Sequence, residues 1–220
     1  MTARAVKKPA GQGRERPQWV SGGVVVISFV AFLYLVELIN QISGNTLARY
    51  GIRPWQAEGL WGILFAPALH VSWAHLIANT IPLVVLGFLM TLLGKSRFIA
   101  ATAIIWLLGG LCTWLIGNVG SSCGPTDHVG ASGLIFGYLA FLLVFGFFVR
   151  KLSNLIVGLV VFFLYGGVLV DAFPVLNMCG GVSWQGHLSG AFAGVVAAFV
   201  LSGPERADRE KTKAAKALTG

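Results

Sequence analysis

The chain alternates between long apolar runs and short connections rich in glycine, proline or charged residues. Crossing the hydrocarbon core of a bilayer takes a helix of about 20 apolar residues. Six runs come close to or exceed that length, at residues 20–42, 73–93, 98–116, 132–148, 155–173 and 184–201. The pattern therefore predicts an all-α, polytopic membrane protein built as a six-helix bundle.

The connection between the first two runs, residues 43–72, is unlike the others. It holds two tryptophans, Trp55 and Trp61, yet glycine and proline break it too often for a straight span. Because tryptophan concentrates at membrane–water interfaces, we expect a structured loop in or on the interface, with Glu37 near it. The membrane domain is expected at residues 20–202, between a basic, disordered tail at 1–19 and a charged tail at 203–220.

Composition and charge narrow the class of partner. Hydrophobic residues make up 56% of the chain and charged residues only 11%, against about 25% charged in soluble domains. Five Lys or Arg lie in the N-terminal tail, two in each of the second and fourth connections and five in the C-terminal tail, which leaves two in the first connection. The positive-inside rule then places both termini in the cytoplasm. The net charge of +8 is thus explained by the membrane topology. We therefore expect a lipid bilayer as partner and no nucleic acid.

One serine lies where a polar, glycine-rich loop becomes an apolar helix, in Gly130-Ala131-Ser132-Gly133. The backbone N–H groups in the first turn of a helix lack intrahelical partners and carry partial positive charge. That environment suits a nucleophile whose attack creates negative charge on a carbonyl oxygen. Small residues around a serine in an apolar run also serve simple helix packing, so this stretch alone leaves both explanations open.

Three of the six runs begin on the outer side, and each carries polar residues near that end. The second run holds His75 and Asn79, whose i, i+4 spacing puts them on one helical face. The fourth run begins with Ser132, and the sixth holds His187. Polar groups inside a span are costly and by default face an internal cavity. We therefore expect these four side chains at one depth of the bundle.

Glycines recur every four residues on the last run, at Gly186, Gly190 and Gly194, and Gly133 and Gly137 repeat that spacing on the fourth. Such faces let two helix backbones approach closely. If the two faces meet, the serine of the fourth run faces the histidine of the sixth. An imidazole within reach of a serine hydroxyl can take its proton and pass it to a leaving group.

Other polar groups of this region have both catalytic and structural explanations. The side chains of His75 and Asn79, with the serine backbone N–H, could supply oxyanion donors, although Asn79 alone fits an interhelical hydrogen bond as well. His70 is expected to brace the first loop. Asp127-His128 lies close to the serine in sequence, but we expect this pair to cap its own loop rather than to complete a triad.

The three cysteines fit no metal-ligand spacing such as C-x-x-C, and no metal or other cofactor is expected. Cys112 lies inside the third run, where packing explains it. Cys123 and Cys179 fall in the two outward loops that precede the fourth and sixth runs. A disulfide between them would tie these loops together, and two free thiols are the alternative.

Three motifs, in this order on the second, fourth and sixth runs, resemble the rhomboid intramembrane serine proteases over residues 20–202. The motifs are His75-x-x-x-Asn79, Gly130-Ala131-Ser132-Gly133 and Gly186-His187-x-x-Gly190-x-x-x-Gly194. The resemblance implies a serine endopeptidase that cleaves peptide bonds in or beside transmembrane segments with a Ser–His dyad. It makes Ser132 the nucleophile, His187 the general base, His75 and Asn79 oxyanion side chains, and Gly130 the residue that shapes the turn.

The chain departs from the family pattern at two places. Many members carry Trp-Arg in the first loop, where this chain has Arg53-Pro54-Trp55 and Gly59-Leu60-Trp61-Gly62. Some members carry a tyrosine four residues after the nucleophile, stacked on the catalytic histidine. Here that position is Phe136, which can stack but offers no hydroxyl.

The resemblance also implies the simple six-span bacterial form, in the plasma membrane with its active site open to the outside. Single-span membrane proteins are the expected substrates, and the sequence predicts no oligomeric state. Two other classes stay open: an inactive relative that binds membrane proteins, and a transporter or channel lined by His75, His187 and Asn79. A metal site on the two histidines is weaker, because two ligands rarely suffice. Ser132 distinguishes a protease from a transporter or channel, because a protease needs the serine hydroxyl and a transport pathway does not.

Overall fold

The structure, a computed structural model, describes residues 16–120, 127–172 and 183–219. Six helical segments in these ranges are long and apolar enough to cross a membrane. They are α1 (Gln18–Ile42), α3 (Trp73–Leu92), α4 (Lys95–Ile116), α5 (Ser132–Val149), α6 (Leu152–Tyr165) continued by the 3-10 helix η4 (Gly166–Ala172), and α7 (Trp184–Leu201). The described residues form no strand beyond one isolated bridge. The predicted all-α, six-helix membrane fold is confirmed.

The helix bounds follow the apolar runs closely, with two differences. The fifth span begins at Leu152, three residues earlier than the apolar pattern predicts, and becomes a 3-10 helix at Gly166. Two consecutive glycines there lower the preference for an α-helix. The third span begins at Lys95, because Gly94 turns the chain sharply with a φ of 110°, a conformation that glycine adopts without a steric cost.

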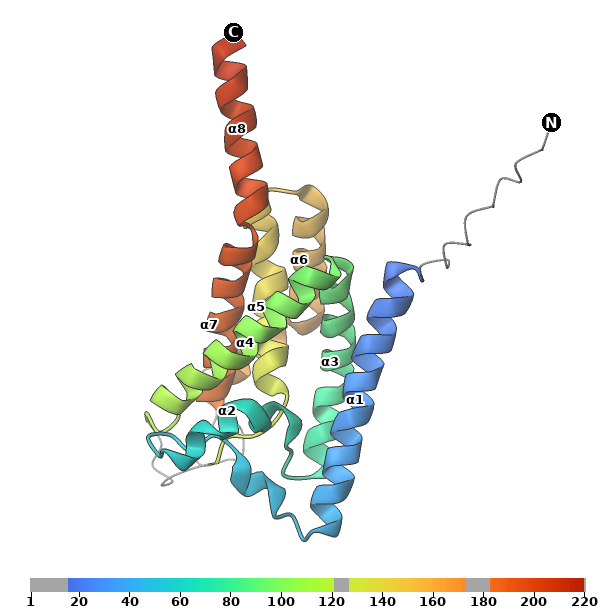
Figure 1. Ribbon diagram of the computed structural model, residues 1–220, viewed down its shortest axis with the longest axis vertical. Coiled ribbons are helices and arrows are strands. Elements are labelled where there is room, and N and C mark those ends of the chain that lie inside the picture. Colours follow the sequence, from blue (N-terminus) through green and yellow to red (C-terminus); the bar gives the residue numbers. More distant parts are fainter. Residues whose placement is uncertain (1–15, 121–126, 173–182, 220) are drawn as a thin grey trace, which may run out of the picture.

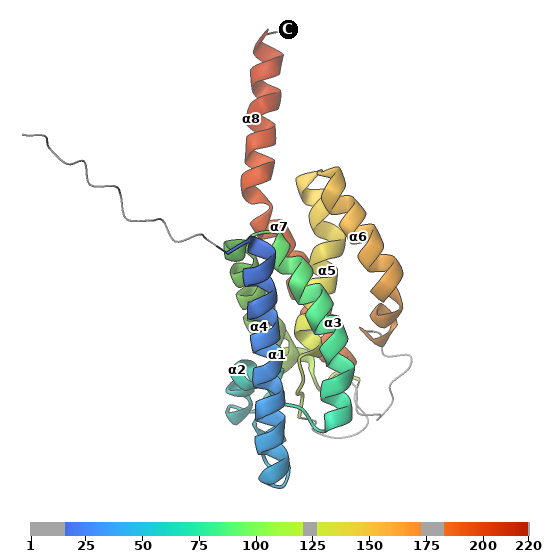
Figure 2. The same cartoon turned by 90° about the vertical axis from the view of Figure 1, so that its right-hand side faces the viewer.

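Helix α5 is the centre of the bundle and α6 lies at its edge. Of the residues of α5, 61% are buried, whereas only 11% of residues 152–169 in the fifth span are. Helices α5 and α7 run side by side over their lengths, and α4 crosses α7 obliquely (Figure 1). Figure 2 shows α6 packed against α5 and standing apart from α1 and α4. Ser132 therefore begins the helix that is best enclosed by its neighbours.

The long first connection is structured, as expected. It contains the 3-10 helices η1 (Leu47–Tyr50), η2 (Glu58–Leu60) and η3 (Ala66–Ala68), and the short α2 (Gly62–Phe65). Two tryptophans of α4 fasten it, because the indole N–H of Trp106 donates to the Ile63 carbonyl oxygen at 2.8 Å and that of Trp114 to the Gln56 carbonyl oxygen at 2.9 Å. The connection is thus held against the end of the bundle where α5 begins, which we call the Ser132 end.

Direct backbone contacts at glycines hold this connection together. A Cβ at Gly62 would overlap the backbone of Gly51, so the two segments cross in direct backbone contact. Arg53, one of the two arginines of the connection, forms an ion pair with Asp127 at 2.8 Å between Nε and Oδ1. The first connection and the loop before α5 are therefore joined without an arginine after Trp61.

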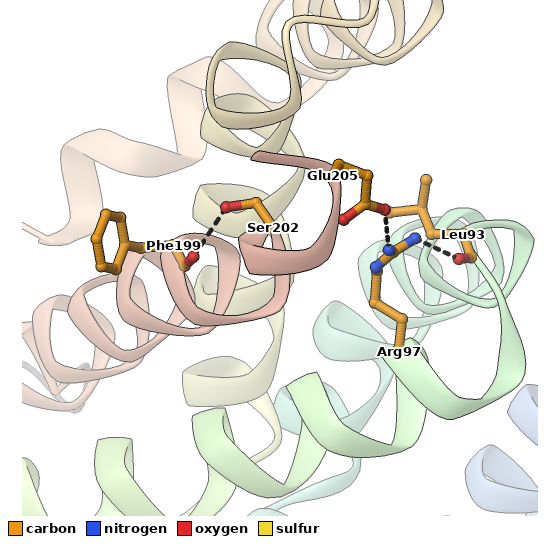
Figure 3. A network of polar contacts seen from close by, with 5 residues as sticks. All are labelled: Leu93, Arg97, Phe199, Ser202 and Glu205. Atoms are coloured by element: carbon orange, nitrogen blue, oxygen red, sulfur yellow. Dashed lines mark hydrogen bonds and ion pairs between the residues drawn. The ribbon is translucent and has the colours of Figure 1, made fainter. Parts of the chain in front are cut away.

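At the opposite end of the bundle, the charged tail continues from α7 as α8 (Gly203–Thr219), which projects beyond the other helices (Figure 1). Arg97 of α4 forms an ion pair with Glu205 and donates to the Leu93 carbonyl oxygen at 2.9 Å (Figure 3). Ser202 donates to the Phe199 carbonyl oxygen at the junction of α7 and α8. These contacts fix the base of α8 to the ends of α3 and α4.

Candidate active site

Ser132 is the first residue of α5, and a glycine turn sets its position. Gly130 has a φ of 118°, and its N–H donates to the Ala66 carbonyl oxygen at 2.8 Å. A Cβ at Gly130 would lie 2.7 Å from Cε1 of His75. Only glycine therefore fits both the backbone conformation and the close approach to α3.

The glycine faces of α5 and α7 meet, as their spacing predicts. A Cβ at Gly190 would overlap the carbonyl oxygen of Gly133, and a Cβ at Gly194 would overlap that of Gly137. Each added methyl group would have to displace a helix backbone rather than a flexible side chain. The absence of side chains on these faces thus determines how close α7 lies to α5.

The imidazole of His187 lies flat on the ring of Phe136. The two ring centroids are 4.0 Å apart and the planes are 13° from parallel, and both residues are buried. Phe136 comes four residues after Ser132, which puts the two on the same face of α5 one turn apart. The stack therefore places His187 over the face of α5 that carries the serine.

His75 and Asn79 approach the same turn from α3. A Cβ at Gly130 would lie 2.9 Å from Nε2 of His75 and 3.7 Å from Nδ2 of Asn79. The Asn79 side-chain nitrogen is buried, and no atom of the described residues makes a hydrogen bond with it. A buried donor without a partner costs about 1–3 kcal/mol. Two polar side chains of α3 thus lie beside Gly130, and the amide nitrogen of Asn79 is available to donate to a ligand.

The acidic residue and the histidine before the turn serve the loops. Asp127 pairs with Arg53, and Nδ1 of His128 lies 2.6 Å from Oγ of Ser183. Neither contact involves Ser132, which agrees with the expected structural role of the Asp127-His128 pair. Cys123 and Cys179 lie outside the described residues, so their pairing stays a prediction.

A small cavity of about 50 Å³ lies beside the serine, between α4, α5, α7 and the first connection. Its lining includes Ser132 and the polar side chains of Thr113, His128 and Ser183. A cavity needs at least about 10–15 Å³ to hold a water molecule. The cavity therefore has room for water beside Ser132. Within the described ranges, no cluster of three His, Cys, Asp or Glu side chains could hold a metal ion.

The Rhomboid domain family matches residues 57–204 of this chain. The chain belongs to the rhomboid family. Uncharacterized proteins of Mycobacterium tuberculosis and Mycobacterium leprae are 68% and 60% identical over 94% and 95% of this chain, and over 87% and 81% of their own lengths. The rhomboid protease GluP of Bacillus subtilis is 30% identical over 80% of this chain and 34% of its own length. With its six spans, this rhomboid protein is a multi-pass membrane protein.

A buried polar network outside the rhomboid match reaches the site from α1. Glu37 is 1% exposed and accepts hydrogen bonds from Asn40 at 3.2 Å and Gln41 at 2.7 Å. Asn40 also donates to the backbone oxygen of His70 at 3.1 Å. The sequence does contain a signal for this network, because Glu37, Asn40 and Gln41 form one polar face on an otherwise apolar run.

His70 connects that network to the turn before the serine. Its Nε2 accepts a long hydrogen bond of 3.5 Å from the Ala131 N–H, and its ring meets that of His75 edge to face at 5.1 Å. Burial, and then the charge of His75, lower the pKa of His70 to about 4. His70 is therefore neutral at pH 7, as an acceptor must be. Its expected role as a brace of the first loop extends to the active-site turn.

Proposed function

We propose that this rhomboid protein is an intramembrane serine endopeptidase in which Ser132 is the nucleophile and His187 the general base. The observation that carries the proposal is the stack of His187 on Phe136, one turn after the serine and on the same face of α5. The direct contact between the glycine faces of α5 and α7 supports it further. The Phe136 ring fixes the plane of the imidazole.

The proposed chemistry proceeds through an acyl-enzyme. The hydroxyl oxygen of Ser132 attacks the scissile carbonyl carbon, while His187 takes the hydroxyl proton. The C–N bond then breaks, and His187 returns the proton to the leaving amine. A water molecule attacks the ester in the same way, giving a carboxylic acid and the free serine. The cavity beside Ser132 can supply this water from within the bundle.

Oxyanion stabilisation is proposed for the α3 side of the turn. The negative charge develops on the substrate carbonyl oxygen, close to the N-terminal N–H groups of α5. The Nδ2 group of Asn79, which has no hydrogen-bond partner among the described residues, can donate to this oxygen. Nε2 of His75, which lies close to Gly130, can do so in the tautomer that carries the proton on Nε2. Such hydrogen-bond donors are already in position before the reaction, so they need no reorganisation when the negative charge develops.

The proposed substrates are single-span membrane proteins, cleaved in or beside the span. Peptide bonds inside a helix are shielded by their hydrogen bonds, so a substrate segment that unwinds easily is favoured. The membrane domain of residues 20–202 would carry the reaction without a cofactor, between the tails at 1–19 and 203–220. The bilayer would present both partners to each other in the bacterial plasma membrane.

We place both termini in the cytoplasm and the Ser132 end outside, from the distribution of Lys and Arg. Alkaline phosphatase is active only outside the cytoplasm, and green fluorescent protein folds only inside. Alkaline phosphatase fused after Gly44 is therefore expected to be active, and green fluorescent protein fused after Gly220 to fluoresce. The reverse pattern would invert the topology.

The dyad is tested with the purified full chain in detergent and a fluorophosphonate probe, which reacts covalently with activated serines. The wild type is expected to be labelled, and Ser132→Ala and His187→Ala not to be. Ser189→Ala is the matched control, because Ser189 is a buried serine of the same bundle whose hydroxyl has no hydrogen-bond partner among the described residues. Its variant should label as the wild type does.

Cleavage is tested with the chain reconstituted in liposomes together with tagged single-span segments. A protease gives fragments that Ser132→Ala does not, whereas a transport pathway or an escort protein is insensitive to that change. Labelling that survives Ser132→Ala would show that another serine is the activated one and would overturn the proposal.

A further inference from the structure

A hydrogen bond outside the proposed dyad joins the two segments that lead into it. His128 comes four residues before Ser132, and Ser183 comes four residues before His187. The Nδ1 atom of His128 and the Oγ atom of Ser183 are 2.6 Å apart. The bond thus joins the segments that precede α5 and α7, the two helices that carry Ser132 and His187.

The backbone of His128 is fixed as firmly as its ring. Its N–H donates to the Ile52 carbonyl oxygen and its carbonyl oxygen accepts from the Ile52 N–H, both at 2.9 Å. The residue is 6% exposed. The first connection therefore holds the main chain at His128 in place, and a short segment then leads through the Gly130 turn to the serine.

The pattern of donors defines one tautomer of the ring. Nε2 of His128 lies against Gly117 at the end of α4, with whose backbone the ring makes a hydrogen bond. The carbonyl oxygen of Gly117 can only accept, so Nε2 carries the proton and Nδ1 accepts from the Ser183 hydroxyl. Burial lowers the pKa of His128, which favours this neutral form.

Ser183 passes the constraint to α7. Its side-chain oxygen caps the helix by accepting from the Gly186 N–H at 2.9 Å, and its backbone oxygen accepts from the His187 N–H at 3.1 Å. The hydroxyl proton is then free to be donated to His128. One serine therefore both caps the helix that carries His187 and binds the segment that carries Ser132.

We propose that His128 is a positioning residue, which through its hydrogen bond to Ser183 holds the first turn of α7 at a fixed distance and rotation from the first turn of α5. The inference rests on the proposed roles of Ser132 and His187. The glycine faces fix how closely the helices approach, but smooth faces leave sliding along the helix axis less restricted. The His128–Ser183 bond supplies that restriction at the end where the proton is transferred.

Two polar substitutions at His128, each of which keeps one of its two hydrogen bonds, separate a positioning role from simple loop packing. In His128→Asn, the amide oxygen takes about the position of Nδ1 and can accept from Ser183. In His128→Gln, the amide nitrogen takes about the position of Nε2 and can donate to Gly117, but nothing replaces the acceptor for Ser183. Both variants are polar and lose the ring, so a packing role would affect them alike.

The measurement is the rate of fluorophosphonate labelling of the full chain in detergent, resolved into probe affinity and limiting rate. A misplacement of reacting groups by about 1 Å can cost about 100-fold in rate, and we expect a loss of about tenfold in the limiting rate for His128→Gln. His128→Asn should stay within about twofold of the wild type, and probe affinity should change in neither variant.

Ser183 provides the second arm. Ser183→Gly removes the hydroxyl while weakening a helix cap much less than alanine would, and it should slow labelling as His128→Gln does. The double variant should be no slower than either single one, because both remove the same bond. This arm decides the matter if His128→Gln does not fold.

Equal limiting rates for His128→Asn and His128→Gln, or additive losses in the double variant, would overturn the inference. The proposed function fails differently, through a wild type that remains unlabelled or labelling that survives Ser132→Ala. A labelled wild type that depends on Ser132 and His187 but not on the His128–Ser183 bond would leave the dyad standing and remove the positioning role alone.

Discussion

The two sides of α5 hold the candidate site by opposite means. Toward α7, glycine backbones touch directly, and no side chain separates the two helices at Gly190 and Gly194. Toward α3 and α1, buried polar side chains fill the space, and several of their atoms lack hydrogen-bond partners within the described ranges. On the α7 side, the direct backbone contact fixes the distance between the two helices. The other side keeps unpaired polar groups, which cost stability but suit charge that appears only during a reaction.

The largest effect is expected on the α7 side. In Gly190→Ala the added methyl group meets the backbone of Gly133, so α7 must shift or tilt. Overpacking of this kind costs about 1–3 kcal/mol of unfolding free energy, and the shift also separates the proposed dyad. We expect labelling by a fluorophosphonate to fall below detection and the melting temperature in detergent to drop.

Gly133→Ala is the matched control for stability on that interface. A Cβ there would lie 3.7 Å from the Gly186 carbonyl oxygen, an ordinary contact. Its melting temperature should therefore stay close to that of the wild type. Equal destabilisation by the two changes would mean that helix propensity, and not the backbone contact, determines the effect.

On the α3 side, Asn79→Ala should separate activity from stability. Losing one oxyanion donor costs about 100- to 1000-fold in rate, so we expect a loss of that order in labelling and cleavage. The melting temperature should not fall, because the amide nitrogen that is removed has no hydrogen-bond partner within the described part of the chain. A large loss of stability with labelling intact would contradict an oxyanion role.

The neighbouring residue gives the opposite pattern. Thr80→Ala removes the contact between the Thr80 and Tyr34 hydroxyls at 3.1 Å, which joins α3 to α1. We expect a modest drop in melting temperature and unchanged labelling. Together the two variants test whether activity and stability lie on separate faces of α3.

The α3 side should also make stability depend on pH through His70. Its pKa is about 4 in the folded protein, against 6.5 for an ordinary histidine. The unfolded chain therefore binds more protons between these values, so stability is complete above about pH 6.5 and falls as the pH drops toward 4. The difference corresponds to at most about 3 kcal/mol.

Thermal unfolding in detergent between pH 7.5 and 4.5 measures this dependence. In His70→Gln the slope should become shallower without disappearing, because burial lowers the pKa of His128 as well. A slope identical to that of the wild type would show that His70 stays neutral in both states or titrates outside this range.

The contrast between the two sides also explains what the sequence could predict. Length and apolarity alone locate the six spans, and the four-residue spacing of Gly186, Gly190 and Gly194 predicts the face that meets α5. These signals are local and periodic. The contacts of Asn40 with His70 and of His128 with Ser183 join residues far apart in the chain, and an apolar run does not reveal how a helix is rotated about its axis. These two polar contacts therefore required the structure.

A smaller loss of labelling than that of Asn79→Ala, and the sharpest test of the α3 side, is expected for Glu37. Glu37→Ala removes the acceptor for Asn40 and Gln41, which loosens the Asn40 contact with His70 and, through it, the turn before the serine. A net hydrogen bond is worth about 1 kcal/mol, so we expect a loss of about fivefold in labelling rate. Glu58→Ala, a change at an exposed carboxylate of η2, should leave the rate unchanged. A Glu37→Ala protein that labels like the Glu58→Ala control would confine the active site to α3, α5 and α7 and make the α1 network purely structural.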